Sequence, residues 1–369
     1  MSNLLSAFAA ALVVAGLWVP APAARPTDRA GRALPARVSL QLGVLGIAGA
    51  TSLDGLVQRV ADSALDDGLT QARSKGLFPT GGSVVVLGLR ERALLGVASA
   101  PEPDRMRALE ALPAGSVVKP FVALAALDEG IDASERRACP ARFEAGGSAI
   151  RNWTGRDGPA MTIPEAIAQS CNTVFASFAA TLWERGDDPA RSAISQAFSS
   201  FGFGVPTGFV PGEQPGYVPP RARSIGDLMV LAIGQGPLTV TPLQVASGFA
   251  RIAGVDASGW AGIAGHPLKE ASRVPSTSSL QPVRRGLERA VRDGTAHSTF
   301  EGLDLNRVPI AGKTGSAEIG DVTPYAWFAA YAPADAPRYV VAVVIERGRR
   351  GAISAAPVAR RVLDALLDL

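Results

Sequence analysis

The stretch GSVVKPF, residues 115–121, points to both the chemistry and the fold of this chain. The apolar run that follows it predicts a buried helix, which tolerates Pro120 in its first turn because no N–H is needed there. A spacing of three residues places Ser116 and Lys119 on one helical face. A serine hydroxyl becomes a good nucleophile when a base removes its proton, and burial lowers the pKa of a lysine enough for that role. The stretch therefore makes Ser116 a candidate nucleophile and Lys119 its candidate base.

Lysine is rare in this chain, which makes each lysine informative. Of the 36 basic residues only four are lysines: Lys75, Lys119, Lys269 and Lys313. Arginine cannot replace lysine where a cation must release its proton, because the pKa of arginine is too high. Lysines kept in such an arginine-rich chain are therefore candidates for chemical roles.

Residues 170–172 (SCN) fall between two predicted helices. Residues 162–165 form a capping box that opens a helix through about Ser170, and residues 173–185 predict a second helix. A hydroxyl and a carboxamide at this junction can relay a proton and hold a substrate amide, which makes Ser170 and Asn172 candidates. Taken alone, the same residues are more often simple helix caps.

Residues 313–316 (KTGS) begin a predicted strand. Lys313 can supply charge for a substrate carboxylate, and the hydroxyls of Thr314 and Ser316 can hydrogen-bond it. Gly315 lets a substrate backbone approach closely, and the N–H of Ser316 can point at a developing oxyanion. Taken alone, an edge-strand lysine beside a turn explains the pattern equally well.

The three patterns carry more weight together than singly. Taken alone, the first is more often a helix-capping serine beside a surface lysine. Each pattern occurs once, however, and all three in this order would arise by chance in about one sequence in a few thousand. Their joint occurrence favours a catalytic site.

The flanking segments predict one sheet with a helical insert. Alternating or continuous apolar runs predict strands at 83–89, 93–99, about 313–319, 326–331 and 339–346. Helices are expected at residues 54–75, with Asp54 as N-cap, and 355–367. The intervening residues, roughly 117–300, predict a helical insert. Because the sheet-forming ends must close around this insert, we expect a cleft between an α/β part and an all-α part.

The first 36 residues differ from the rest. Residues 4–19 are almost wholly apolar and precede a stretch of small residues, which is typical of a signal peptide or a short membrane anchor. We expect residues 1–24 to be this signal peptide or anchor, 25–36 a polar linker and 37–369 the folded domain. The protein is then extracytoplasmic, in the periplasm or cell envelope.

Composition narrows the function further. The chain of 369 residues is 47% hydrophobic, enough for one large domain, and its net charge of +3 is too small for a nucleic-acid binder. Its two histidines, His266 and His297, lack ligand spacing, so no metal site is expected. Cys139 and Cys171 fit either a disulfide or two separate small apolar residues, and the sequence leaves both possibilities open.

The ordered motifs resemble the penicillin-binding transpeptidase family, which carries Ser-x-x-Lys, Ser-x-Asn and Lys-Thr-Gly in this order. The resemblance covers about residues 37–369 and is closest to monofunctional, class B members. It includes further segments at 234–236, 241–244, 294–296 and 327–331. The fold it implies is α/β plus all-α, like that of serine β-lactamases, with a five-stranded antiparallel sheet, flanking helices and a helical subdomain. Residues 37–115 leave no room for a glycosyltransferase domain, so a shortened N-terminal region is expected.

The resemblance implies a peptidoglycan D,D-transpeptidase. Ser116 would attack the D-Ala–D-Ala carbonyl, with Lys119 as base. Ser170, linked to Lys313, would pass a proton to the departing D-alanine, and Asn172 would hold an amide of the acyl group.

The same resemblance assigns the substrate contacts and partners. Thr314 and Ser316 would bind the terminal carboxylate, Gly315 would give the substrate room, and the N–H groups of Ser116 and Ser316 would form the oxyanion hole. Peptidoglycan stem peptides are the expected partners, with β-lactams as covalent inhibitors of Ser116. No metal or organic cofactor is implied.

Three alternatives share this site. A β-lactamase of class A needs a glutamate that activates water, and Glu213 has the wrong sequence context; class D enzymes have valine where this chain has Asn172. A D,D-carboxypeptidase uses water as acceptor and has no distinguishing motif. A non-enzymatic penicillin sensor would signal through a further module, and none is visible.

Overall fold

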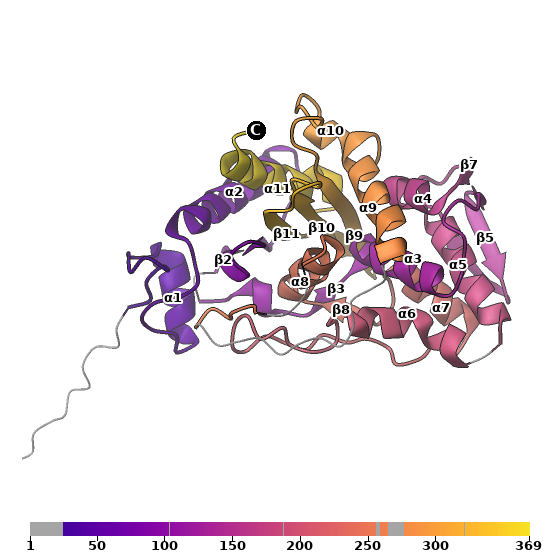
Figure 1. Ribbon diagram of the computed structural model, residues 1–369, viewed down its shortest axis with the longest axis horizontal. Coiled ribbons are helices and arrows are strands. Elements are labelled where there is room, and N and C mark those ends of the chain that lie inside the picture. Colours follow the sequence, from indigo (N-terminus) through magenta and orange to yellow (C-terminus); the bar gives the residue numbers. More distant parts are fainter. Residues whose placement is uncertain (1–24, 103, 187, 256–258, 265–276, 321) are drawn as a thin grey trace, which may run out of the picture.

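The computed structural model describes residues 25–102, 104–186, 188–255, 259–264, 277–320 and 322–369. Its centre is a five-stranded antiparallel sheet with strand order β2-β1-β11-β10-β9 (Figure 1). These strands are β1 (Gly81–Gly88), β2 (Ala93–Ala100), β9 (Ala311–Ile319), β10 (Val322–Ala332) and β11 (Tyr339–Glu346). The two sheet-forming ends of the chain thus meet side by side, as the sequence predicts, and the expected fold class is confirmed.

The central strands are buried on both faces. On one face, Val84 and Val86 of β1 pack with α2 (Gly55–Ser74) and α11 (Gly351–Leu367). On the other face, Val85 and Leu87 belong to a second core that includes α8 (Pro242–Ile252). Side chains alternate along a strand, so a nearly continuous apolar run is the sequence that a strand covered on both faces requires.

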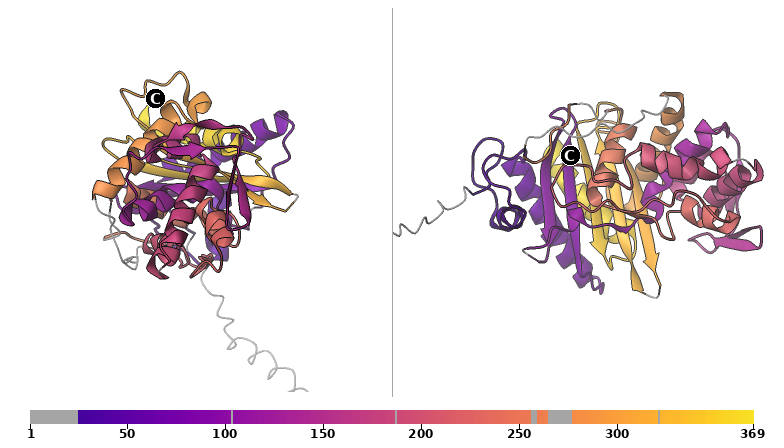
Figure 2. Two further views of the ribbon diagram at one scale, coloured as in Figure 1. Left: turned by 90° about the vertical axis from the view of Figure 1, so that its right-hand side faces the viewer. Right: turned by 90° about the horizontal axis from the view of Figure 1, so that it is seen from below.

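The inserted part is mainly helical, and the right-hand view of Figure 2 shows the sheet between α1 and this part. The remaining helices are α1 (Ala36–Val44), α3 (Lys119–Asp128), α4 (Ile163–Gln169), α5 (Asn172–Glu184), α6 (Asp188–Ser200), α7 (Ile225–Ala232), α9 (Thr277–Arg292) and α10 (His297–Phe300), with short 3₁₀ turns η1 (Arg107–Leu109) and η2 (Gly115–Val118). The predicted N-terminal caps of α2 and α4 are confirmed. Asp54 accepts hydrogen bonds from the first turn of α2, and Thr162 forms the capping box of α4.

The structure also contains short strands, in the insert and just before it, that the sequence analysis missed. They pair as β3 (Leu112–Pro113) with β8 (Thr239–Val240), β4 (Arg137–Cys139) with β7 (Gly158–Met161), and β5 (Arg142–Ala145) with β6 (Ser148–Arg151). Each is too short to show clear alternation. The turn between β5 and β6 did carry a sequence signal, the pair Gly146 and Gly147. A tight hairpin turn requires positive φ, which both glycines adopt.

Residues 25–36, described above as a polar linker, make ordered contacts in the structure. Asp28 is buried, accepts hydrogen bonds from the N–H groups of Ala30 and Arg32, and forms an ion pair with the Arg32 side chain at 2.8 Å. Thr27 bridges to Ala33 and Ala50. The polar residues here satisfy one another and fold against the domain, and composition alone hides this. The predicted signal peptide or anchor, residues 1–24, lies outside the described residues.

Among the described helices, none combines the length and apolar character needed to cross a membrane.

Candidate active site

Ser116 lies in η2, the tight turn that leads into α3. Gly115 has a φ of +58°, and its N–H donates to the carbonyl of Gly234 at 2.8 Å. A Cβ on Gly115 would lie 2.4 Å from the Ser316 carbonyl oxygen. Only glycine fits this conformation and this contact, so the turn packs directly on β9 while Ser116 itself stays partly exposed.

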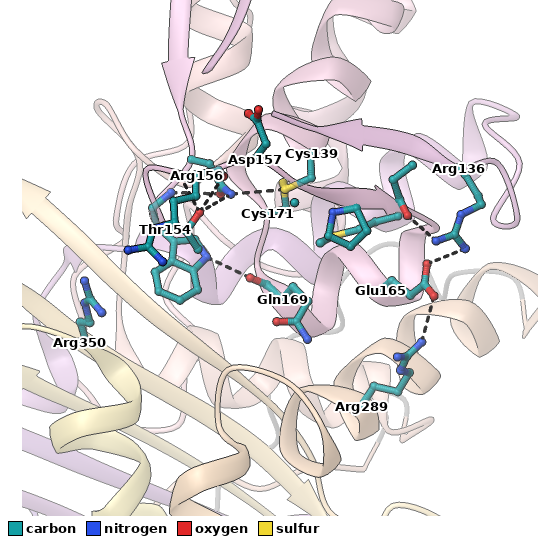
Figure 3. A pocket seen from close by; sticks show the side chains of 16 residues that line it. Arg136, Cys139, Thr154, Arg156, Asp157, Glu165, Gln169, Cys171, Arg289 and Arg350 are labelled. Atoms are coloured by element: carbon teal, nitrogen blue, oxygen red, sulfur yellow. Dashed lines mark hydrogen bonds and ion pairs between the residues drawn. A yellow bond between two sulfur atoms is a disulfide. The ribbon is translucent and has the colours of Figure 1, made fainter. Parts of the chain in front are cut away.

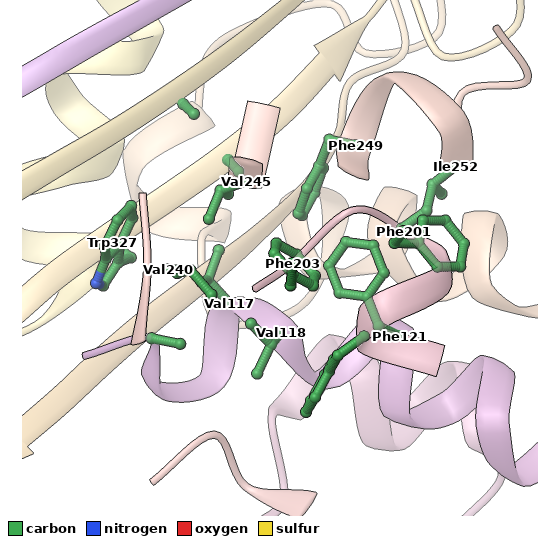
Figure 4. Close-up of a cluster of buried hydrophobic side chains, with 14 of the residues drawn as sticks. Val117, Val118, Phe121, Phe201, Phe203, Val240, Val245, Phe249, Ile252 and Trp327 are labelled. Atoms are coloured by element: carbon green, nitrogen blue, oxygen red, sulfur yellow. The ribbon is translucent and has the colours of Figure 1, made fainter. Parts of the chain in front are cut away.

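Apolar side chains fix the turn from beneath (Figure 4). Val117 and Val118 are fully buried, and Phe121 makes edge-on contacts with Phe201 and Phe203 at centroid distances of 4.8 and 4.9 Å. Such aromatic pairs add to the stabilisation from burial. A rigid core thus holds the backbone of Ser116 in one position.

Lys119 is fully buried and contacts the second motif. Its Nζ donates to the Ser170 carbonyl at 2.8 Å, to Ser170 Oγ at 3.3 Å and to Asn172 Oδ1 at 2.6 Å. Burial, together with the nearby charge of Lys313, holds the pKa of Lys119 well below its ordinary value. Burial therefore favours the neutral form of Lys119 more than that of an exposed lysine. Within the described contacts, no hydrogen bond yet joins Lys119 to Ser116.

The second motif lies at the junction of α4 and α5. Ser170 ends α4 in the left-handed conformation, with φ +54°, and Asn172 is the first residue of α5. The helix-cap explanation fails, because the side chain of Asn172 accepts from Lys119 and donates to the Arg151 carbonyl at 3.0 Å. Cys171, between them, forms a disulfide with Cys139 of β4. The question that the sequence left open is thereby answered.

The third motif lies on β9, the edge strand of the sheet. Lys313 is fully buried, which lowers its pKa to about 7, and its Nζ donates to the Thr314 carbonyl at 3.0 Å. The expected link between Ser170 and Lys313 is not a direct hydrogen bond in the described structure. Ser170 instead receives its hydrogen bond from Lys119.

The absence of a side chain at Gly315 also serves packing within the protein, a role that the sequence analysis did not give it. A Cβ there would lie 2.9 Å from the Val117 N and 3.0 Å from the Trp327 Cβ. The missing side chain thus lets η2 and β10 pack against β9, which brings the first and third motifs together. Thr314 is buried and Ser316 is partly exposed beside Gly315.

Two further residues contact the third motif, and the sequence analysis assigned neither a role. The hydroxyls of Thr295 and Thr314 share a hydrogen bond of 2.7 Å, and the N–H of Thr295 donates to the Ala168 carbonyl in α4. Gln235 donates to the Ser316 carbonyl at 3.4 Å and accepts from the N–H of Glu318. Both lie in segments noted only for their resemblance, 294–296 and 234–236.

Other ionisable groups have different surroundings. Glu213 is buried, which raises its pKa, and its carboxylate accepts hydrogen bonds from Thr207 and Thr241. It therefore ties a loop to the start of α8. Among the described residues, no group of His, Cys, Asp and Glu side chains could hold a metal ion; His266 lies outside them.

Comparisons with known proteins identify relatives of this chain. Residues 82–364 match the family model "Penicillin binding protein transpeptidase domain". The peptidoglycan D,D-transpeptidase MrdA of Haemophilus influenzae is 28% identical over 300 residues, 70% of this chain and 44% of that protein. The peptidoglycan D,D-transpeptidase PbpA of Mycolicibacterium smegmatis is 30% identical over 285 residues, 70% and 55% of the two chains. The chain spans about half the length of the curated relatives it matches.

Solved structures show the same likeness. Penicillin-binding protein A from M. tuberculosis, solved as an imipenem acyl-enzyme complex, superposes with a TM-score of 0.70 at 25% identity, covering 86% of this chain and 79% of that one. A chain of a peptidoglycan synthase complex gives a TM-score of 0.75 at 27% identity, covering 87% and 63%. With the family model matched over most of its length, this chain belongs to the penicillin-binding protein transpeptidase domain family and is class B-like.

Proposed function

We propose that this protein is a serine-type peptidoglycan D,D-transpeptidase that works through an acyl-Ser116 intermediate. The observation that carries the proposal is the buried Lys119, whose lowered pKa and contacts with Ser170 and Asn172 join the first two motifs behind Ser116. A neutral lysine in that position is the base that a serine nucleophile needs.

The acylation step follows from these contacts. Neutral Lys119 takes the proton of Ser116 as the hydroxyl oxygen bonds to the carbonyl carbon of the penultimate D-alanine. The N–H groups of Ser116 and Ser316 stabilise the oxyanion. When the C–N bond breaks, the proton passes from Lys119 through the Ser170 hydroxyl to the leaving amine, along the 3.3 Å hydrogen bond. Asn172 holds an amide of the acyl group.

The terminal carboxylate of the donor is bound at β9. Thr314 and Ser316 donate their hydroxyl hydrogens, Gly315 keeps the strand close to η2, and protonated Lys313 supplies the opposite charge. The hydrogen bond shared with Thr295 orients the Thr314 hydroxyl. β-Lactams present a carboxylate beside a reactive carbonyl and acylate Ser116 in the same manner.

Deacylation by an amine completes the cross-link. The amine of a second stem peptide attacks the ester carbonyl, its proton moves to Lys119, and Ser116 leaves with that proton. The transpeptidase names of the relatives support an amine acceptor over water, which a D,D-carboxypeptidase would use. The commitment of Glu213 to Thr207 and Thr241 counts against rapid hydrolysis of the kind that β-lactamases perform.

The cellular setting is also part of the proposal. Residues 1–24 act as signal peptide or membrane anchor, and the transpeptidase domain begins at about residue 37, with residues 25–36 folded onto it. The disulfide between Cys139 and Cys171 supports an extracytoplasmic location, because such bonds persist in oxidising compartments.

The test is a product assay with a donor peptide ending in D-Ala–D-Ala and a D-amino acid as acceptor. Mass spectrometry is expected to show release of D-alanine and a product carrying the acceptor, in wild type and in K75A, which changes an exposed lysine. S116A should yield neither. Release of D-alanine without incorporation of the acceptor would favour the carboxypeptidase, and no release by the wild type would reject the proposal.

A further inference from the structure

A cavity of about 620 Å³ lies beside the second motif (Figure 3). Its wall is formed mainly by the loop and strand of residues 152–161, by α4 and by Arg350. Neither Ser116 nor Lys313 lines it. The cavity is therefore separate from the catalytic groups, and the acylation chemistry gives it no role.

The wall of this cavity is hydrogen-bonded to the second motif. Trp153 Nε1 donates to the Gln169 carbonyl at 3.0 Å, one residue before Ser170. Asn152 Oδ1 accepts from the N–H of Asn172 at 3.2 Å. The cavity wall is therefore joined to the backbone on both sides of Cys171, next to the residue that contacts the acyl group in the proposed mechanism.

Arg350 reaches the cavity from the part of the fold that contains the sheet and α11, whereas most of the wall belongs to the helical insert. It precedes α11, where Gly351 packs so closely that a Cβ would lie 2.8 Å from the Gly315 carbonyl oxygen. The guanidinium carbon of Arg350 lies 5.4 Å from the centre of the Trp153 ring. This cation–π contact joins the sheet side and the helical side of the cavity wall.

Four guanidinium groups line the cavity together with two carboxylates, Glu165 and Asp157, and Asp157 accepts from the N–H of Ala141 at 2.6 Å. Glu165 forms ion pairs with Arg136 at 3.1 Å and Arg289 at 3.5 Å. Arg156 and Arg350 also line the cavity and are exposed, and the described part of the chain gives neither a carboxylate partner. Figure 3 shows these two arginines on one side of the view and the Glu165 cluster on the other.

We propose that this cavity binds a carboxylate of the donor stem peptide, on a residue upstream of its D-Ala–D-Ala end. Arg350 and Arg156 supply planar guanidinium donors that match a carboxylate in geometry and charge. Trp153 supplies a flat apolar surface for the peptide beside them. The inference rests on the proposed function, since it assumes that a donor peptide occupies the groove past Asn172.

The test is equilibrium binding to S116A, which prevents acylation. Two peptides ending in D-Ala–D-Ala are compared, one with free upstream carboxylates and one with those groups converted to carboxamides. S116A with both arginines intact should bind the peptide with free carboxylates about fivefold more tightly than the carboxamide peptide. This is the effect of one or two partly exposed charge-assisted hydrogen bonds. R350Q and R156Q should each reduce this preference. R73Q, which removes an exposed arginine of α2, is the matched control and should keep it.

Each outcome separates the two proposals. Equal affinity for the two peptides, or an equal loss in R73Q, overturns the cavity proposal, whereas covalent labelling of Ser116 by penicillin would still support the proposed function. If labelling fails, the proposed function fails, and the peptide comparison still decides whether the cavity binds carboxylates. If R350Q does not fold, R156Q carries the test, because Arg156 lies on an exposed loop.

Discussion

The disulfide between Cys139 and Cys171 gives the sharpest test of how the second motif is held. Removing it in C139A/C171A frees the residue between Ser170 and Asn172 from β4. The bond closes a loop with a sequence separation of 32. The chain-entropy relation for a loop of that length gives about 4 kcal/mol of stabilisation at 25 °C, through restriction of the unfolded chain. We therefore expect the free energy of unfolding to fall by about 2–4 kcal/mol.

The same change should slow acylation. Ser170 and Asn172 accept the hydrogen bonds of Lys119, and displacement of catalytic groups by about 1 Å can cost up to about a hundredfold in rate. The assays are urea unfolding and the second-order rate of labelling by a fluorescent penicillin, with and without dithiothreitol. Reduced wild type should have the unfolding free energy and labelling rate of the double variant. The reductant should change neither quantity in the double variant. Unfolding free energy and labelling rate both unchanged on reduction would refute the reasoning.

Three further predictions concern β9 and η2. Burial lowers the pKa of Lys313 to about 7, so its charge is lost as the pH rises through that value. The rate of acylation by penicillin should therefore fall between about pH 6 and 8. A rate that does not change over this range would contradict a role for the charge of Lys313. T295V removes the hydrogen bond to Thr314, worth about 1 kcal/mol, so labelling should slow about fivefold with the melting temperature nearly unchanged; an unaffected rate would exclude positioning by Thr295. G115A should lose more than about 2 kcal/mol of unfolding free energy in urea, because it combines positive φ with a clash. G130A also has a positive φ, +79°, but no clash, and should lose only about 1–2 kcal/mol; equal losses would contradict the argument from close packing.

The sequence predicted those features that depend on local patterns. The apolar runs at 83–89, 93–99 and 339–346 became the buried strands of the sheet, because their period and length already satisfy both faces. The capping box at Thr162 placed the end of α4, and with it the position of Ser170. The grouping of the three motifs around one site came from their order and from the family resemblance.

Features that depend on tertiary contacts were not predictable in this way. Nothing local marks Cys139 as the partner of Cys171, because the small sheet that carries Cys139 has strands too short to recognise. The hydrogen bond between Thr295 and Thr314 joins the turn after α9 to an edge strand. The fold of residues 25–36 depends on Asp28, whose burial no composition rule foresees.

The central claim is that Ser116 is a nucleophile activated by a neutral Lys119. Its most direct test is the mass of the intact protein after incubation with penicillin, followed by peptide mapping. Wild type should gain one stable adduct, mapped to Ser116, whereas S116A should gain none. K119R should lose labelling about a thousandfold or more, because arginine keeps its charge and cannot take a proton. An adduct on another residue, or K119R labelled at the wild-type rate, would contradict the account.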